Sequence, residues 1–485
     1  MPDKIEYAGQ FQIDIAEIFS SEGKRVGIEP NIIKLTLYED IDRPWIRGEC
    51  LMHNQASMQT ITPLLGQEYF RLKLKTPSLP PSDSFGKNTI DYSEHVFHIY
   101  TVGKANLGTG TEAVSFSFIT GEIMKNGRVL ISEALEGSCS QIVFRMLERV
   151  DCRKPRWIEP SADFKKVVAP NISPFTVINM MKKQALSTST TRNSPRFLFY
   201  ENFEGFHFRS LDNLFTNERV WYYNTKPEGA SFDHAQVQVM NDLETILSYN
   251  MTMNDQRNDQ MSGMLSSDLI VHDITTKSFS EHRFDYFKAF HGEITSVHPS
   301  FPSPVYNQSP VDDIGTKVTW GRNKQMLQPD STRAGLDLRS IENAQSSSYY
   351  TKSGIPAFNT FAPEKWMQRR TSAMAEMNST IGLNMRAHGN TMITVGDLVN
   401  CTIPHHAQVM PEGSQNQPKE DKFFSGNYLI RRIKHDFTVE GFYHEMNMTL
   451  YKNGLEDELS EKKDAHEPMP EKMGPVYGPP PSFFR

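Results

Sequence analysis

The stretch FRLKLK at residues 70–75 places apolar side chains at its even positions and basic side chains at its odd positions. Because successive side chains of a β-strand point to opposite faces of a sheet, this pattern predicts a strand with one buried face and one basic face. The stretch IKLTLY at residues 33–38 alternates in the same way, and so do Val114, Phe116 and Phe118. The first third of the chain is therefore predicted to be a small antiparallel barrel or sandwich.

Helical signals interrupt this pattern further along the chain. Ser138 and Gln141 have the spacing of a capping box, in which each side chain satisfies a free backbone N–H of the other residue. Pro174 is placed to open a second helix, because the first helical position needs no N–H. Residues 197–200 and 206–208 are rich in aromatic side chains and flank a Gly-containing turn at 202–205, which predicts a hairpin. This middle section is expected to be α+β.

The last part of the chain returns to strands. Strand-like patterns occur at 246–253 and 269–271, and again from 395 to 450, while the stretch 298–356 is rich in prolines and serines and predicts an irregular excursion. The spacing of Trp366, Arg370, Met374 and Met377 predicts a helix before the strands resume. The final 31 residues, 455–485, contain six prolines and seven acidic residues, and they are expected to be extended.

Charge and composition exclude several classes of protein. The 485 residues include 51 Lys+Arg and 58 Asp+Glu, a net charge of −7, whereas a protein that grips nucleic acid by its phosphates normally has a basic excess. The four cysteines form no C-x-x-C pair, and neither a disulfide framework nor a Cys-rich zinc site is expected. The sequence shows neither an export signal nor an apolar run long enough to span a membrane, so a cytoplasmic site of synthesis is expected.

The residues that could carry chemistry do not form a recognisable set. His405 and His406 adjoin a proline, while His435 and His444 lie on neighbouring predicted strands, so a metal site is one interpretation and ordinary cross-strand partners are the favoured one. The acidic run 456–458 is expected to be solvated, and no nucleotide-binding or nucleophile-elbow motif occurs. No catalytic, cofactor-binding or metal residue is predicted, which favours a structural or assembly protein over an enzyme.

Three groups of segments, taken in order, resemble a known family. They are 173–179 with 197–201 and 205–211; 261–265 with 269–273; and 395–399 with 425–430, 435–437 and 446–451. Together they are similar to the baseplate hub protein of contractile-tailed, myovirus-type bacteriophages, to which the N-terminal part of type VI secretion spike proteins is related. The resemblance extends over about residues 5–453.

This resemblance implies a β-rich α+β fold with two antiparallel barrels like those of a tail tube. The implied division is a first barrel at 1–118, an α+β domain at 119–235, a second, split barrel at 236–285 and 378–455, an irregular or helical insertion at 286–377, and an extended tail at 456–485. Three chains would then present six barrels, a ring that matches a sixfold tube to a threefold spike.

The function implied is that of a structural hub in the virion's tail baseplate, assembled in the host cytoplasm. Expected partners are two further copies of the chain, the central spike, the tail tube or its initiator, and the baseplate wedge proteins, with DNA passing through without specific binding. The acidic net charge suits a channel wall that repels phosphate. In the C-terminal tail, Tyr477, Phe483 and Phe484 are candidate docking anchors. A tail-associated glycan hydrolase and a peripheral receptor-binding protein remain the alternatives.

Overall fold

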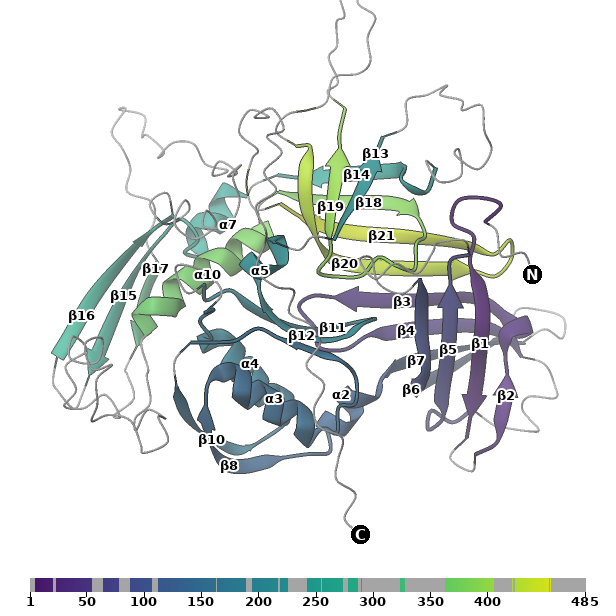
Figure 1. Cartoon of the computed structure of the whole chain (residues 1–485), viewed down its shortest axis with the longest axis horizontal. Coiled ribbons are helices and arrows are strands. Elements are labelled where there is room, and N and C mark those ends of the chain that lie inside the picture. Colours follow the sequence, from purple (N-terminus) through teal and green to yellow (C-terminus); the bar gives the residue numbers. More distant parts are fainter. Residues whose placement is uncertain are drawn as a thin grey trace, which may run out of the picture.

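Figure 1 shows the computed structural model of the chain. The residues that the structure describes are 5–20, 23–54, 64–77, 88–106, 112–162, 164–188, 194–216, 219–225, 242–253, 255–273, 278–286, 289, 323–327, 363–379, 381–404, 421, 424–452 and 454. Residues 405, 406, 477, 483 and 484 lie outside this part of the chain. None of the helices in the described part is long and apolar enough to cross a membrane.

The described residues form a strand-rich α+β fold, which confirms the predicted class, and one antiparallel sheet dominates it (Figure 1). The strands follow the order β14-β18-β21-β20-β3-β4-β7-β6-β5-β1-β2, with β19 beside β20 and β13 beside β19. In the first part of the chain these elements are β1 (Gln12–Phe19), β2 (Arg25–Gly27), the 3-10 helix η1 (Glu29–Asn31), β3 (Ile32–Asp40), β4 (Arg47–Asn54), β5 (Tyr69–Lys75), β6 (Thr89–Asn106) and β7 (Glu112–Thr120).

The first seven strands enclose a core of their own, and the alternating pattern at 70–75 explains how. Its three apolar side chains are fully buried, as predicted. On the opposite face of β5, Arg71 pairs with Glu17 at 3.1 Å and Lys73 pairs with Asp91 at 3.0 Å. Strand β6 is long and irregular in its pairing with both neighbours, and it passes from β5 to β7 on its way around the core.

The middle section is a separate α+β unit. Its elements are α2 (Gly121–Asn126), β8 (Ile131–Gly137), α3 (Cys139–Arg149), β9 (Arg156–Ile158), β10 (Lys165–Ile172), α4 (Pro174–Gln184), β11 (Phe197–Asn202), β12 (Gly205–Ser210) and α5 (Leu211–Phe215). The capping box of Ser138 and Gln141 opens α3, Pro174 is the first residue of α4, and β11 pairs with β12, so these three predictions are confirmed. One apolar core joins both helices to these strands.

The second half of the large sheet comes mainly from the end of the chain. Its strands are β13 (Val220–Asn224), β14 (Ile246–Thr252), β18 (Gly382–His388), β19 (Leu398–Thr402), β20 (Gly426–Thr438) and β21 (Tyr443–Tyr451). They cover another apolar core, to which residues of β11 and α5 also contribute. The structure thus has two strand-built cores within one continuous sheet.

The strand partners differ from the expected division in two places. Strands β15 (Ser266–Asp273) and β16 (Ser278–Asp285) were expected in the split barrel, but they pair with each other and with β17 (Asn323–Leu327) in a separate three-stranded sheet. Strand β13, expected in the α+β domain, pairs with β19 in the large sheet. An alternating pattern identifies a strand, but its partner is chosen by packing between segments that lie far apart in the chain.

Helices α7 (Gln256–Met261) and α10 (Pro363–Ser379) lie beside the small sheet (Figure 1). Helix α10 covers the predicted helical spacing, which is therefore confirmed. Side chains of α10 hold the small sheet against the helix. The Gln368 amide donates to the backbone oxygen of Ser267 at 2.8 Å, and the Ser372 hydroxyl donates to the backbone oxygen of Met264 at 2.7 Å. These bonds satisfy buried backbone oxygens next to β15.

Candidate functional site

The seam between β3 and β20 is the place where the two halves of the large sheet join. The strands are antiparallel, and their register runs from Arg432 opposite Asp40 to Thr438 opposite Lys34. These paired positions are separated by about four-fifths of the sequence, yet the sheet passes through them without a break. The seam therefore fixes the two halves by a ladder of backbone hydrogen bonds rather than by a linker.

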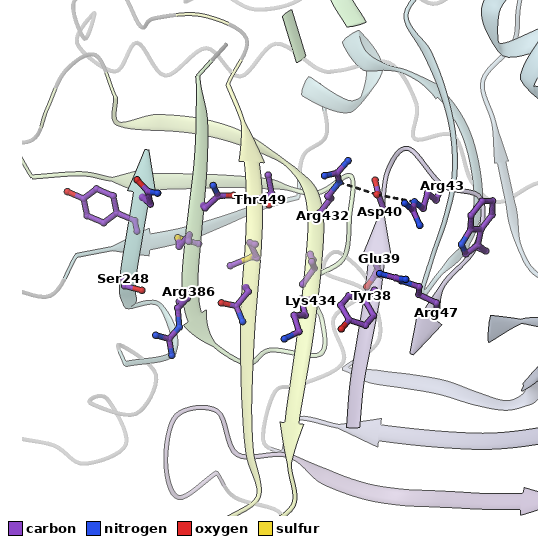
Figure 2. A pocket seen from close by; sticks show the side chains of 18 residues that line it. Tyr38, Glu39, Asp40, Arg43, Arg47, Ser248, Arg386, Arg432, Lys434 and Thr449 are labelled. Carbon is purple, nitrogen blue, oxygen red and sulfur yellow. Dashed lines mark hydrogen bonds and ion pairs between the residues drawn. The ribbon is translucent and has the colours of Figure 1, made fainter. Parts of the chain in front are cut away.

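One face of this joined sheet is hollowed into a groove of about 610 Å³, shown in Figure 2. It is lined by side chains of β3, β4, β14, β18, β20 and β21 and of the loop that joins β3 to β4. At the loop end, the guanidinium group of Arg47 lies 4.6 Å from the ring centroid of Tyr38, and that of Arg43 lies 5.9 Å from the ring centroid of Trp45. We call this set of side chains the seam groove.

Several charged side chains of the seam groove are paired with charged groups in or beside it. Arg432 contacts Asp40 at 3.1 Å (dashed in Figure 2), and Arg386 makes a two-pronged contact with Glu445 at 2.9 and 2.8 Å. Such pairs across neighbouring strands are individually weak at a surface, about 0–1 kcal/mol each. Five of the lining residues are basic and two are acidic, so the lining is basic on balance, in contrast to the acidic wall expected from the net charge. Carboxylates just outside the lining, Glu445 and Asp436, pair with Arg386 and Lys434.

Asp436 shows how the seam holds its charges. Its carboxylate accepts hydrogen bonds from Thr36 at 2.8 Å and contacts Lys434 at 2.8 Å and Lys34 at 3.1 Å. Burial alone would raise the pKa of Asp436, but these hydrogen bonds and the Lys434 charge outweigh it and hold the pKa below the ordinary value. Asp436 therefore stays ionised and joins β3 to β20.

Beneath the groove lies a buried polar cluster formed by Glu39, His435 and His444. The Nδ1 atom of His435 is 3.1 Å from Nε2 of His444, and its Nε2 atom is 3.3 Å from a carboxylate oxygen of Glu39. The other carboxylate oxygen of Glu39 accepts from the Thr394 hydroxyl and from the Val395 N–H. Burial, followed by the nearby His435, lowers the pKa of His444 well below its ordinary value, so this ring is neutral.

This cluster contains two of the histidines that the sequence offered as a possible metal site. His435 and His444 lie on β20 and β21 and contact each other, which confirms the favoured interpretation as cross-strand partners. Within the described residues, no group of three or more His, Cys, Asp or Glu side chains is arranged to hold a metal ion. The docking anchors Tyr477, Phe483 and Phe484 stay a prediction, because the structure does not describe them.

Sequence reasoning missed the acidic and basic partners of the seam. The alternating pattern at 33–38 does extend to Asp40, and in Arg432 and Lys434 the outward positions of β20 are basic. This complementarity is the signal that could have paired β3 with β20. It was not decisive, since many other predicted strands also carry charged residues at alternate positions.

Comparison with protein-family models gives no match, and comparison with curated protein sequences gives none. Solved structures to which the chain is similar include the tail protein from Neisseria meningitidis MC58, at 7% identity and TM-score 0.49, over 92% of this chain and 98% of that one. The prophage MuSo2 43 kDa tail protein from Shewanella oneidensis has 8% identity and TM-score 0.46, over 91% and 99%. The E. coli c3393 protein, a component of the type VI secretion system, has 7% identity and TM-score 0.36, over 93% and 79%.

These neighbours are phage-tail and type VI secretion proteins, the two classes to which the sequence motifs were found similar, and the predicted resemblance is confirmed in that sense. At such low identities and TM-scores they carry no conclusion about what this chain does.

Proposed function

We propose that the chain is a structural hub of a phage-tail baseplate, and that three copies form a ring with pseudo-sixfold symmetry. The observation that carries this proposal is the seam: two strand-built cores share one sheet through β3 and β20. A chain with two such units side by side supplies two positions of a ring. Three copies related by a threefold axis then supply six, which lets a threefold spike meet a sixfold tube.

The groove face supports a role at the channel of such a ring. The face is polar, and its basic and acidic side chains are paired, as Arg432 with Asp40 and Arg386 with Glu445. Strong binding to DNA requires a basic surface that releases counterions from many phosphates. Because Arg386, Arg432 and Lys434 are each engaged by a carboxylate, this face offers phosphate fewer available cations, so DNA can pass along it without being held.

The partners follow from the same proposal. Two further copies of the chain would flank the ring positions, the spike would meet one end, and the tube or its initiator would meet the other. Wedge proteins would surround the ring, and the hub would belong to the virion's tail baseplate after assembly in the host cytoplasm. The C-terminal tail, with Tyr477, Phe483 and Phe484, is proposed as a docking arm for a neighbouring hub subunit or the spike.

Native mass spectrometry of the full chain, alone and with the spike protein from the same gene cluster, tests this proposal. A trimer in either sample is expected, and a chain that stays monomeric in both contradicts it. Imaging of particles labelled on this chain should then place the label on the tail axis. A peripheral label would favour a receptor-binding protein, and release of soluble sugars from purified cell wall would favour a glycan hydrolase.

A further inference from the structure

A buried cluster of one lysine and two carboxylates lies where the first seven strands meet the α+β unit. Lys154 lies between α3 and β9, Glu122 is in α2, and Glu201 is in β11. The lysine is 5% exposed, Glu122 is 6% exposed and Glu201 is fully buried. Burying three ionisable groups costs several kcal/mol per ion before their mutual attraction is counted, so the arrangement calls for a specific explanation.

The geometry brings the lysine nitrogen onto both carboxylates. Lys154 Nζ donates to Oε1 of Glu201, and it donates to Oε2 of Glu122 at 2.9 Å. The second oxygen of Glu201, Oε2, accepts from the hydroxyl of Thr120 at 2.7 Å. The carboxyl group of Glu201 is thus held from two sides, with one oxygen on the amine and the other on a hydroxyl donor.

Aromatic rings surround the lysine nitrogen. The ring centroids of Tyr92 and Phe206 lie 5.2 and 5.9 Å from Lys154 Nζ. Tyr92 is 3% exposed and Phe206 is fully buried, so the rings limit the access of water to the nitrogen. In such a site the charged forms of an amine and an acid lose part of their advantage over the neutral forms.

The two carboxyl groups differ in their affinity for a proton. Burial raises the pKa of Glu201 to about 7, with Lys154 opposing the rise and Glu122 adding to it. For Glu122, burial is outweighed by the charge and hydrogen bond of Lys154, and the pKa is held below the ordinary value. Near neutral pH, Glu201 is therefore the carboxyl group that takes up a proton, whereas Glu122 stays ionised.

We propose that Lys154 and Glu201 join in an intramolecular amide bond, with Glu122 as the general acid and base. Glu122 takes a proton from the Lys154 ammonium group, and the neutral amine nitrogen attacks Cδ of the protonated Glu201 carboxyl group. Glu122 then gives a proton to the departing hydroxyl, which leaves as water, and takes one of the two protons on nitrogen, so that the amide keeps a single N–H. One C–N bond forms, one C–O bond breaks, one water leaves, and Glu122 ends protonated, so neither a cofactor nor an oxidant is needed.

The chemistry is slow but needs to happen only once. The two carboxylates raise the pKa of Lys154 by more than burial lowers it, so the proton transfer to Glu122 is uphill. The fixed contacts compensate in part: Lys154 Nζ is hydrogen-bonded to the carboxyl group that it attacks, and a nucleophile held near its target reacts far faster than one that is free in solution. Glu122 also lines a cavity of about 300 Å³ that can receive the expelled water.

The bond would tie the segment before β9 to strand β11. The segment already lies against the hairpin of β11 and β12, because the N–H of Phe206 in β12 donates to the backbone oxygen of Pro155 at 3.0 Å. A cross-link between positions 154 and 201 closes a long loop in the unfolded chain and so removes conformational freedom there, as a disulfide does. Unlike a disulfide, this bond is not broken by the reducing cytoplasm.

The mass of the denatured full chain tests the proposal directly. The expected mass is that of the sequence less one water, and digestion should yield a single branched peptide that contains Lys154 and Glu201. Lys154→Arg and Glu201→Ala should each restore the full mass, and Glu122→Gln should leave the bond unformed or much slower to form. The readings for Lys154→Arg and Glu201→Ala do not depend on whether the variant folds well, because each variant lacks one of the two reacting groups.

Lys166→Arg is the matched control, because Lys166 contacts Glu136 at 3.5 Å in an exposed pair. This variant should retain the loss of water. A wild-type chain with the full mass and separate peptides for Lys154 and Glu201 overturns the proposal and leaves a permanent ion cluster. A loss of water that maps to other residues overturns it equally.

Discussion

Replacing Leu72 with alanine should destabilise the first half of the large sheet far more than replacing the adjacent Lys73. Leu72 is fully buried in the central position of β5, opposite Ala16 on β1 and Tyr92 on β6. Truncating a buried leucine to alanine costs about 2–5 kcal/mol, the sum of the lost transfer free energy and of the cavity left behind. Lys73 points to the other face, where its pair with Asp91 contributes about 0–1 kcal/mol.

The assay must separate this half from the other cores, because a chain with several cores need not unfold in one step. Hydrogen exchange read peptide by peptide does so. In peptides of β1, β5 and β6, Leu72→Ala should lower the free energy of opening by the amount given above, whereas Lys73→Ala should leave it nearly unchanged. A stronger variant, Leu72→Asp, buries an unpaired carboxylate as well and should prevent this half from folding. Equal destabilisation by Leu72→Ala and Lys73→Ala would refute the assignment of the two faces.

Three further predictions concern the seam and the tail. In a urea titration, Gly389→Ala should lower the free energy of unfolding by about 1–3 kcal/mol, because a Cβ there would lie 1.9 Å from the ring of His444. Gly127→Ala is the control: the nearest contact of its Cβ would be at 3.6 Å, so the free energy of unfolding should change little. The pKa of Asp436 is lowered in the folded state, so the ionised side chain stabilises the fold above the unfolded pKa of about 3.9. This contribution is lost as the pH falls through the folded value. Asp436→Asn should therefore flatten the acid limb of a plot of unfolding free energy against pH, and an unchanged limb would contradict this. Deleting residues 468–485 should leave the melting temperature unchanged but weaken binding to one partner in a pull-down, and unchanged binding to every partner would remove the docking role.

Local patterns were sufficient to predict the elements whose partners lie close in the chain. The buried face of residues 70–75, the capping box of α3 and the β11–β12 hairpin each depend on side chains a few positions apart. His435 and His444 were likewise found as partners, because β20 and β21 are joined by a short turn. In each case the cause is local: alternation of side chains along a strand, a capping pair three residues apart, or a short turn. Such features can be recognised in a single sequence.

The features that support the proposed function depend on strands and side chains that pair across long stretches of the chain. Such pairing cannot be recognised in a single sequence. Nothing local to Asp40 points to Arg432, and nothing local to Lys154 points to Glu122 or Glu201. The placement of 266–285 failed for the same reason, since β15 takes its second partner from 323–327 rather than from the split barrel. Which strands pair is decided by the total burial of apolar faces, and alternation is the same for every candidate partner.

At the seam, the interactions that fix the orientation of the two halves differ from those that set the charge of their exposed face. The ion pairs on the groove are weak and are screened by salt, so they contribute little to holding β3 against β20. The backbone ladder lies within the sheet and the contact of Glu39 with His435 is buried, so they are not screened in that way. Charges on the groove face can therefore change without loosening the joint between the two halves. In a ring built from such chains, the surface along the channel could be retuned while the positions of the six units stay fixed.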